Sequence, residues 1–317
     1  MFKIYKCDSE AFNELTLDKL VKNTWFNLVN PTIEELNMVA AATKAPLDFL
    51  KAALDEEERS RIELDENFML VLTNIPVMLS ETNYDTLPLG IIISPDFIIT
   101  VCLENNPVVY EFNSESARTF NTAKRTRFLF QILYKSATYY LKYLRQINRQ
   151  TDQIEVDLRR SMKNKEIFQL MDLQKGLTYF TASLRSNGVV MDRLLRLRLN
   201  SQSQHLIKMY EEDEDLLEDV IIENNQAIQM VEMYSHIMGS MTDAFASIIS
   251  NNLNMVMKFL ASMTIILAIP TMIASFWGMN VRVPFSDGNP FGFLFVLGIA
   301  SVITAVSAFV LLKKRLF

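Results

Sequence analysis

A long stretch near the C-terminal end of the chain, residues 254–280, contains only one charged residue, Lys258. At about 1.5 Å rise per residue, the part after Lys258 is long enough to cross a hydrocarbon layer of about 30 Å. A second uncharged run follows at residues 291–312. The pattern predicts a transmembrane domain at 254–317, with helices over about 256–278 and about 291–312 and a loop at 279–290.

The first of these helices carries one narrow stripe of small or polar residues. Steps of alternately three and four residues connect the stripe, which begins at Asp243, Ser247 and Ser250. Within the apolar stretch its members are Asn254, Met257, Ala261, Thr264, Ala268, Thr271 and Ser275. A 3.5-residue period is typical of the seam along which bundled helices face one another. Small residues on a seam allow close packing, but Asn, Thr and Ser also suit a wall that faces water. We interpret the stripe as pore-lining.

Residues 1–113 carry the strand patterns of the chain. Short apolar or β-branched runs bounded by Pro, Asn and Asp predict strands at 2–5, 24–28, 67–75, 89–93, 97–103 and 108–112. Thr32, followed three residues later by Glu35, predicts a capped helix start. Because no helical crossover recurs between the strands, we expect a mixed α/β cytoplasmic domain in a protein of the α+β class.

Residues 114–253 have a helical pattern instead. Glycine occurs there only at 176, 188 and 239, and proline is absent between Pro107 and Pro270. Such a run predicts very long helices, at about 116–163, 165–198 and 203–278, of which the last continues into the membrane. We expect these cytoplasmic helices to form a funnel and stalk.

The distribution of charge predicts the orientation of the chain. Its net charge is −6, yet the end after the second span is basic (Lys313, Lys314, Arg315). Arg282 is the one basic residue of the intervening loop. By the positive-inside rule both termini are cytoplasmic, in a multi-pass protein of the cell's inner membrane, and the loop is periplasmic. The N-terminus lacks the apolar core of a signal peptide.

Several classes of chemistry find no support in the sequence. Cys7 and Cys102 fit no metal or redox spacing and are expected to be free thiols, while His205 and His236 are isolated. Phosphate loops, catalytic serine motifs and His-Glu-x-x-His are absent. We therefore expect neither an enzyme nor a nucleotide-binding or nucleic-acid-binding protein.

The end of the first span carries a family resemblance. Gly278, Met279 and Asn280 close this helix after Trp277, and a short loop, a second span and a basic terminus follow. This arrangement resembles the CorA family of divalent-cation channels. The resemblance implies a homopentamer in the lipid bilayer that takes up Mg²⁺, with Co²⁺ or Ni²⁺ as further cargo, and it makes Gly278, Met279 and Asn280 the selectivity filter. The alternative for this tripeptide is a helix C-cap followed by a turn.

The same resemblance implies which residues face the pore. They are Asp243, Asn254, Met257, Leu260, Ala268 and Thr271, and the stripe adds Thr264 and Ser275. Asn280, once per subunit, would form a ring of amide oxygens that binds Mg²⁺ through its hydration shell. Met257 and Leu260 would form an apolar constriction that can dewet. Alternatively, the two apolar side chains pack between helices, and the hydroxyls bond their own i−4 carbonyls.

An acidic run at residues 211–219 precedes the stripe. Such a run is most often a solvated helix face. The sharper hypothesis is a regulatory Mg²⁺ site between subunits, with Asp219 at a position that relatives use in this way. Its partner in the neighbouring subunit is not evident, since the matching position falls near Lys51 and Ala52, and Asp55 or Glu56 is the nearest acid.

Taken with the CorA resemblance, which implies selection at residues 278–280 and inhibition by intracellular Mg²⁺, the sequence predicts a channel for hydrated Mg²⁺ driven by the membrane potential. A first alternative is a related transporter of Zn²⁺ or another dication, with or without proton coupling. A second, of another class, is a membrane-anchored coiled-coil scaffold that conducts nothing.

Overall fold

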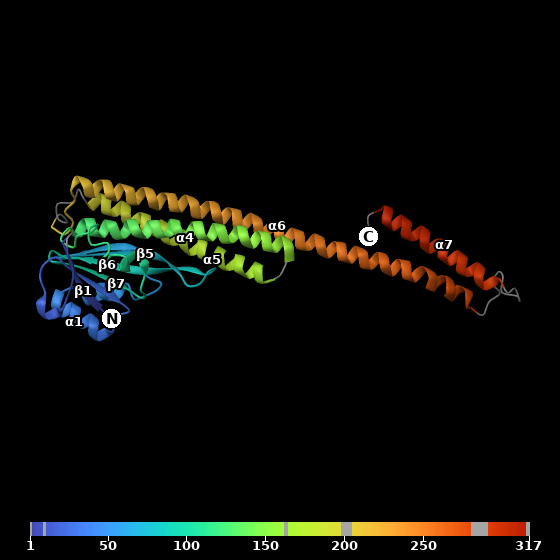
Figure 1. Ribbon diagram of the computed structural model, residues 1–317, viewed down its shortest axis with the longest axis horizontal. Helices are drawn as coiled ribbons and strands as arrows, with labels where there is room; N and C mark the ends of the chain where they lie inside the picture. Colours follow the sequence, from blue (N-terminus) through green and yellow to red (C-terminus); the bar gives the residue numbers. More distant parts are fainter. Residues whose placement is uncertain (1, 9–10, 162–163, 198–204, 280–290, 315–317) are drawn as a thin grey trace. The chain divides into compact units, whose positions relative to one another are not determined.

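The computed structural model describes residues 2–8, 11–161, 164–197, 205–279 and 291–314. They fall into two compact units, Met1–Met238 and Gly239–Phe317. Figure 1 shows the elements along the chain. The strands are β1 (Phe2–Cys7), β2 (Phe12–Leu15), β3 (Thr24–Val29), β4 (Arg61–Asp65), β5 (Phe68–Met78), β6 (Tyr84–Ile93) and β7 (Phe97–Cys102). The helices are η1 (Leu17–Lys19), α1 (Ile33–Thr43), α2 (Leu47–Ala52), α3 (Pro107–Tyr110), α4 (Arg125–Ser161), α5 (Asn164–Leu197), α6 (Glu211–Trp277) and α7 (Gly292–Lys313).

The strands of the first unit form one mixed sheet. Their spatial order is β2-β1-β3-β7-β6-β5-β4. Only the central pair β3 and β7 is parallel, and every other neighbouring pair is antiparallel. With its long helices and its two apolar C-terminal helices, the chain has the predicted α+β class.

One face of the sheet packs under α1 and α2. Leu36 and Val39 of α1 and Leu50 of α2 are buried there, in one cluster with strand residues such as Phe26 and Leu70. The helix start that the sequence predicts at Thr32 is confirmed, because the Thr32 side chain accepts from the Glu35 N–H and the Glu35 carboxylate accepts from the Thr32 N–H. This reciprocal cap fixes where the chain leaves the sheet.

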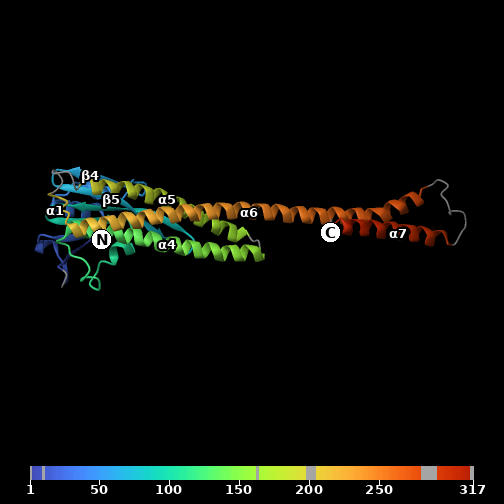
Figure 2. The ribbon, with the colours of Figure 1, turned by 90° about the horizontal axis from the view of Figure 1, so that it is seen from above.

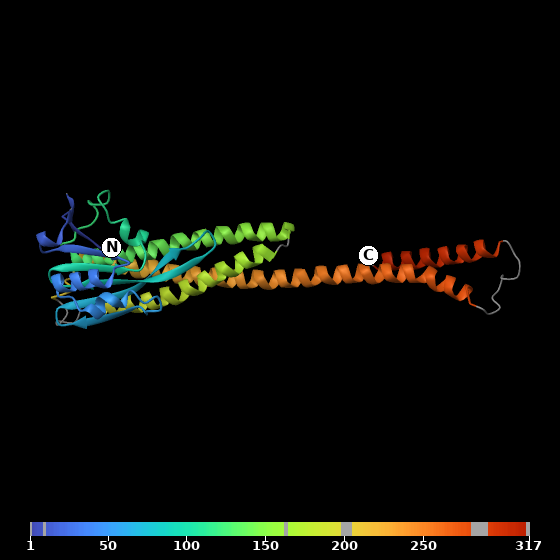
Figure 3. The same ribbon diagram turned by 90° about the horizontal axis from the view of Figure 1, so that it is seen from below.

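The opposite face is covered by α4 and α5, which run side by side along it (Figures 1 and 3). Tyr140 of α4 packs against Phe180 of α5 with ring centroids 5.0 Å apart, and Phe180 also contacts Tyr84 of β6. The first part of α6 joins this layer, since Asn224 Nδ2 donates to the Leu184 carbonyl of α5. The helices α4 and α5 therefore cover this side of the sheet, and the first part of α6 packs against α5.

Three sequence predictions about local structure are wrong, and one of them is the start of the last long helix, which begins at Glu211 instead of about 203. Residues 108–112 do not form a strand, because the Asn106 side chain caps Val108 N–H and starts the short helix α3 with Pro107 in its first turn. The first long helix begins at Arg125 instead of 116. Ahead of it, Asn113, Ser116 and Thr119 form side-chain hydrogen bonds that stabilise turns. Cys7 and Cys102 are free and buried, as predicted.

The second unit consists of the C-terminal part of α6 and of α7. The turn and loop residues 280–290 lie outside the described part of the chain. Within the unit, α7 runs back along the end of α6 (Figures 1 and 2). At about 1.5 Å per residue, the 22 residues of α7 extend about 33 Å.

Candidate functional site

Two helices of the described chain, α6 and α7, are long and apolar enough to cross a membrane. Within the most apolar window of each, only 6% and 0% of the residues are buried. Large apolar side chains such as Leu267, Phe293 and Val302 are between 63% and 73% exposed. An apolar surface of this extent needs lipid or other helices around it.

The small and polar stripe lies on exposed surface of α6. Every predicted pore-lining residue is exposed: Asp243, Asn254, Met257, Leu260, Thr264, Ala268, Thr271 and Ser275. Met257 and Leu260 are 57% and 58% exposed, so neither packs in a core of the single chain. The stripe is therefore available to a second copy, to lipid or to water.

A different stripe of α6 is covered. Ser262 is 3% exposed, and Ile266, Ile269, Ile273 and Trp277 are half-buried. Their spacing of three and four residues marks a single helix face. On α7 the less exposed residues also share one face, namely Gly292, Val296, Ala300, Thr304, Ser307, Ala308 and Leu311. Because α7 lies beside this part of α6 (Figure 2), these two faces are the ones that the helices turn toward each other.

The pore stripe lies on the opposite side of α6 from the covered stripe. Thr264, Ala268 and Thr271 are each two residues from a covered residue, and two residues correspond to about 200° around an α-helix. The same holds for Ser275, which lies between Ile273 and Trp277. The second span of the chain consequently leaves the pore stripe free.

The hydroxyls of the stripe hydrogen-bond to the backbone of their own helix. Thr264 Oγ1 donates to the Leu260 carbonyl at 2.8 Å, and Thr271 Oγ1 donates to the Leu267 carbonyl at 3.0 Å. The i−4 alternative is therefore the one that the structure shows. It leaves each oxygen with lone pairs directed away from the helix axis. A row of acceptors is the chemistry that the water shell of a cation requires, because those waters donate.

A shallow hollow of about 600 Å³ follows the stripe. Thr264, Ala268, Thr271 and Ser275 form its floor, and larger side chains border it. The sequence analysis did not single out these bordering residues, Leu267, Met272 and Phe276. Their positions could have been predicted, because each of the three adjoins a stripe residue in the sequence. Pro270 lies inside this helix, as the predicted span of 256–278 implies, and its lack of an N–H leaves the Ile266 carbonyl without its usual partner.

The predicted filter lies where α6 ends. Gly278 N–H still donates to the Ala274 carbonyl at 2.9 Å, and Met279 is 53% exposed. A Cβ at Gly278 would meet the Ala274 carbonyl oxygen at 3.4 Å, an ordinary contact, and its φ is not left-handed. Nothing in the described part of the chain therefore requires glycine here. Asn280, the third residue of the predicted filter, lies outside the described residues.

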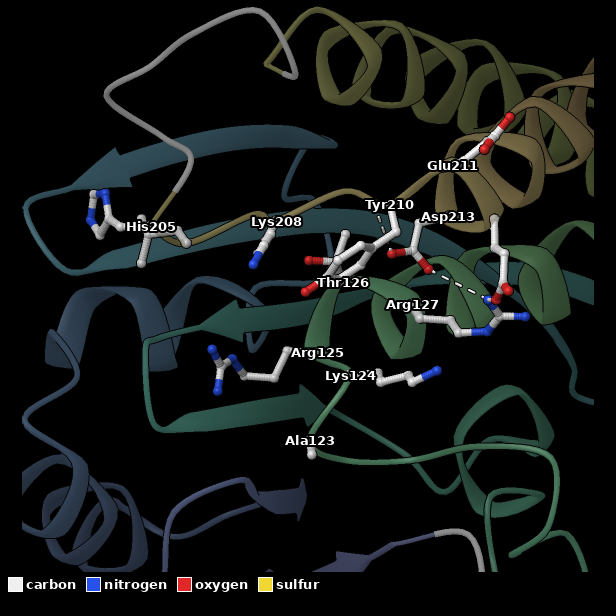
Figure 4. Close-up of a pocket in the computed structure, with 12 residues that line it drawn as sticks. Ala123, Lys124, Arg125, Thr126, Arg127, His205, Lys208, Tyr210, Glu211 and Asp213 are labelled. Atoms are coloured by element: carbon white, nitrogen blue, oxygen red, sulfur yellow. Dashed lines mark hydrogen bonds and ion pairs between the residues drawn. The ribbon is translucent and has the colours of Figure 1, made fainter.

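The acidic run begins α6 and is partly neutralised there. Figure 4 shows Arg127 of α4 directed at this helix start. Its Nη1 lies 2.8 Å from Glu212 Oε2 and 3.7 Å from Asp213 Oδ1. Asp213 is buried and accepts from the Tyr210 N–H at 3.1 Å. Acids in a first turn stabilise a helix through its macrodipole, so these residues have a structural role. They border a cavity of about 780 Å³ with Lys124, Arg125 and Lys208.

The two acids predicted for regulation are both exposed. Asp219 lies on α6, and Asp55 follows α2, where its Oδ1 accepts from the Glu57 N–H at 3.1 Å. Among the described residues, no group of three or more His, Cys, Asp or Glu side chains is arranged to hold a metal ion.

Fold and site together define a membrane protein with two candidate spans and a large mixed α/β and helical unit. The chain belongs to the CorA-like Mg²⁺ transporter family, whose model matches residues 22–315. The resemblance inferred from the sequence is therefore confirmed. The family consists of transport proteins, which agrees at this level with the expectation that the chain is not an enzyme.

Similar proteins cover nearly the whole chain. The cobalt/magnesium transport protein CorA of Methanocaldococcus jannaschii is 26% identical over 314 residues, which are 96% of this chain and 93% of the relative. The complete structure of the CorA magnesium transporter from that organism matches with a TM-score of 0.81 and 24% identity, over 98% of this chain and 96% of the other.

Two further solved structures share the fold. The full-length CmaX protein matches with a TM-score of 0.70 and 16% identity, over 99% of this chain and 97% of its own. The ZntB cytoplasmic domain from Vibrio parahaemolyticus matches with a TM-score of 0.59 and 13% identity, over 79% of this chain and 98% of its own. At such identities these likenesses concern the fold alone.

Proposed function

We propose that this chain is one subunit of a homo-oligomeric channel that takes up hydrated Mg²⁺ across the inner membrane, with both termini cytoplasmic. The observation that carries the proposal is the exposed stripe on α6, which lies opposite the face that α7 covers. A small and polar face that the chain's own second span leaves open is suited to face an axis shared with other copies.

The requirement for several copies follows from the bilayer. One α6 and one α7 cannot enclose water, and a polar stripe turned to lipid would leave its oxygens without partners. Several stripes around an axis solve this problem. Five copies, which the CorA resemblance implies, is the number we adopt.

The chemistry of the stripe fits a dication that keeps its water. Mg²⁺ dehydrates reluctantly, so its first shell of waters presents donors to whatever surrounds it. Thr264 and Thr271 present acceptor lone pairs because their own protons are engaged with carbonyls. A ring of Asn280 amide oxygens at the outer mouth would add stronger acceptors without a fixed charge that holds the ion too long.

Two further rings of side chains complete the path. Asp243 is exposed on the same face of α6 as the stripe, and a ring of these carboxylates would concentrate dications on the cytoplasmic side. Met257 and Leu260 would form the apolar constriction that closes by dewetting. The membrane potential supplies the driving force, because a dication moving inwards gains ~4.6 kcal/mol per 100 mV.

Regulation is proposed to use Mg²⁺ as a ligand as well as cargo. Asp219 of one subunit and Asp55 of its neighbour would repel each other until the ion neutralises them. An ion that binds only where the two carboxylates are close together shifts the equilibrium toward the subunit arrangement in which they are close. We assign this closed state to high intracellular Mg²⁺.

Flux into liposomes tests the proposal. Full-length protein is reconstituted with a Mg²⁺-sensitive dye inside, and an inward-negative potential is imposed. Wild type should conduct, and Asn280→Ala should abolish Mg²⁺ conduction or its preference over other cations. Absence of flux in the wild type would instead support a non-conducting scaffold.

The cargo is tested in the same vesicles. External Zn²⁺, Co²⁺ and Ni²⁺ are added in competition with Mg²⁺, with and without a proton gradient. We expect Mg²⁺ flux to need no proton gradient. Flux of Zn²⁺ that excludes Mg²⁺ and follows the proton gradient would support the Zn²⁺ transporter instead.

A further inference from the structure

A second concave site lies in the first unit, on the sheet face opposite the α1 and α2 core. The pairing of β1 with β3 places Lys3 beside Asn27 and Tyr5 beside Trp25, and the parallel pairing of β3 with β7 places Thr100 beside Asn27. Because alternate strand residues share a face, these five side chains point away from Phe26 and Leu28. None of them belongs to the proposed transport path.

Aromatic rings enclose this place on most sides. The cavity measures about 410 Å³, which lies within the range of small-molecule sites, roughly 300–1,000 Å³. Buried Trp25 and Phe112 form its floor, and the partly exposed rings of Tyr5, Phe12 and Tyr110 form its sides. Tyr5 and Phe12 lie 4.7 Å apart, centroid to centroid. Flat aromatic walls favour a flat aromatic occupant.

Two consecutive hydrogen bonds orient the side-chain amide of Asn27, which lines the same cavity. Trp25 Nε1 donates to Thr100 Oγ1 at 2.9 Å, and Thr100 Oγ1 donates to Asn27 Oδ1 at 3.0 Å. Since the amide oxygen of Asn27 is engaged, its NH₂ group is the part that remains for a ligand. Among the residues that the structure describes, this NH₂ group has no hydrogen-bond partner.

The rim of the cavity offers two more polar groups. The exposed side-chain amide of Asn105 has no partner in the described part of the chain. Lys3 Nζ lies at the rim, 4.0 Å from Glu14 Oε1, a distance too long for a hydrogen bond. The site thus combines aromatic walls, two amides suited to the edge of a nitrogen heterocycle, and one cation at the edge.

We propose that this cavity binds a planar nitrogen heterocycle that carries an anionic group, the chemistry of a purine mononucleotide. This departs from the expectation of no nucleotide binding, which was drawn from the absence of phosphate loops, because the cavity would hold the base through aromatic rings and amides and needs no such loop. The ring lies beside the paired rings of Tyr5 and Phe12, which are in contact with each other, and beside Tyr110, so that its faces contact aromatic carbon. Its edge accepts from the Asn27 NH₂ group and pairs with the Asn105 amide. The phosphate reaches Lys3, which serves as a point charge.

Isothermal titration calorimetry of the full-length protein in detergent tests this site, with adenosine 5′-monophosphate as the probe. Saturable binding is expected, weaker for adenosine and absent for ribose 5-phosphate, because the ring supplies most of the contact. Asn27→Leu should weaken binding of the nucleotide by about tenfold, the effect of losing one paired base edge. Lys3→Met should lower its affinity to that of adenosine.

Asn13→Leu is the matched control. Asn13 is an exposed asparagine of the neighbouring strand β2, next to the lining residue Phe12 in sequence and hence on the other sheet face. This variant should bind as wild type does. If Asn27→Leu fails to fold, Asn105→Ala on the exposed rim replaces it, and this variant should also bind the nucleotide more weakly than wild type does. Absence of saturable binding, equal binding of ribose 5-phosphate, or unchanged affinity in the Asn27 and Asn105 variants would overturn the proposal.

Discussion

Glu111 binds two partners from α4 and is the clearest titrating group of the first unit. Lys135 Nζ forms an ion pair with its Oε2, and the Tyr139 hydroxyl donates to its Oε1. Partial burial raises the pKa of this carboxyl, but the bonds from Lys135 and Tyr139 outweigh burial and hold the pKa below its ordinary value. A carboxyl with a lowered pKa stabilises the fold above its unfolded pKa of about 4.3 and loses that contribution as pH falls.

Glu111→Gln should therefore lower the unfolding temperature at neutral pH, and this effect should shrink in acid as the pH falls below the unfolded pKa of about 4.3 and through the lower folded pKa. Because the side chain is 35% exposed, solvent screens the interaction, and we expect a shift of about 2 °C. Thermal unfolding of the full-length protein in detergent measures it across pH. Glu115→Gln, at a nearby exposed position, is the control. An equal shift at both pH extremes would contradict the electrostatic account.

Ala268 gives the most direct test of the pore stripe. It lies in the hollow on α6, whereas Ala274 is exposed on the same helix but belongs neither to the stripe nor to the covered face. The native thiols Cys7 and Cys102 are buried, and burial raises the pKa of Cys102 to about 12, so neither reacts readily.

A charged, water-soluble thiol reagent should thus block Mg²⁺ flux of Ala268→Cys by most of its amplitude. Ala274→Cys, which we place against lipid, should keep its flux. Reconstituted vesicles measure both before and after treatment. Equal block of the two variants, or none in Ala268→Cys, would mean that the stripe does not face water.

The sequence predicted which residues share the stripe, because helical periodicity alone determines that. It left open how Thr264 and Thr271 use their hydroxyls, since the i−4 bond and a water-facing hydroxyl have the same spacing. The structure shows the i−4 bonds. The sequence also left open whether Gly278 belongs to a filter or to a helix C-cap. In the described part of the chain a Cβ at Gly278 makes only an ordinary contact, so this geometry does not require glycine for either role.

At the scale of elements, Gly176 sets how closely α5 approaches the sheet. A Cβ at this position would lie 3.0 Å from Tyr84 Cβ and 3.1 Å from the Tyr84 carbonyl oxygen of β6. Gly176→Ala should destabilise the first unit by ~1–3 kcal/mol, because backbone atoms cannot move aside as a flexible side chain can. That cost exceeds the gain in helix propensity of about 1 kcal/mol.

Gly239→Ala is the matched control, since it is also helical and a Cβ there meets nothing within 4 Å. It should be neutral or stabilising by up to about 1 kcal/mol. Urea unfolding of the full-length protein in detergent, followed by far-UV circular dichroism, compares the two. Equal effects of both substitutions would show that α5 has room to shift from β6.

The type of an element could be predicted where the pattern of apolar residues was long, and the prediction failed where that pattern was short. Helices of 34 to 67 residues follow from runs with few glycines, in which Pro270 of α6 is the one proline. The strands β2 and β4, four and five residues long, were missed. Residues 108–112 are apolar enough for a strand, but the Asn106 cap and Pro107 determine the outcome. A short apolar run is ambiguous, and local capping chemistry decides it.

At the scale of the whole molecule, the acidic start of α6 divides into two groups with different roles. Glu212 and Asp213 are held by Arg127, and this ion pairing ties α6 to α4 in the first unit. Asp215 and Asp219 remain exposed. The sequence alone could not separate the two groups, because Arg127 is 85 residues from Glu212 along the chain.

Asp219→Asn should make Mg²⁺ flux less sensitive to Mg²⁺ inside the vesicle, because one ligand of the proposed site between subunits is removed. The inhibiting concentration should rise about fivefold or more, the lower end of usual coupling between sites. Asp55→Asn should act in the same direction, since the ion is proposed to lie between the two carboxylates. Flux is measured at a series of internal Mg²⁺ concentrations.

Asp215→Asn provides the control at a second exposed acid of the same helix. A general loss of negative charge would shift inhibition equally in the Asp215 and Asp219 variants and would argue for screening instead of a defined site. A shift confined to Asp219 would place the regulatory ion there. If Asp55→Asn then leaves inhibition unchanged, Asp219 must find a different partner, with Glu56 the next acid along the chain. Unchanged inhibition in every variant would show that Asp55, Asp215 and Asp219 take no part in inhibition by internal Mg²⁺.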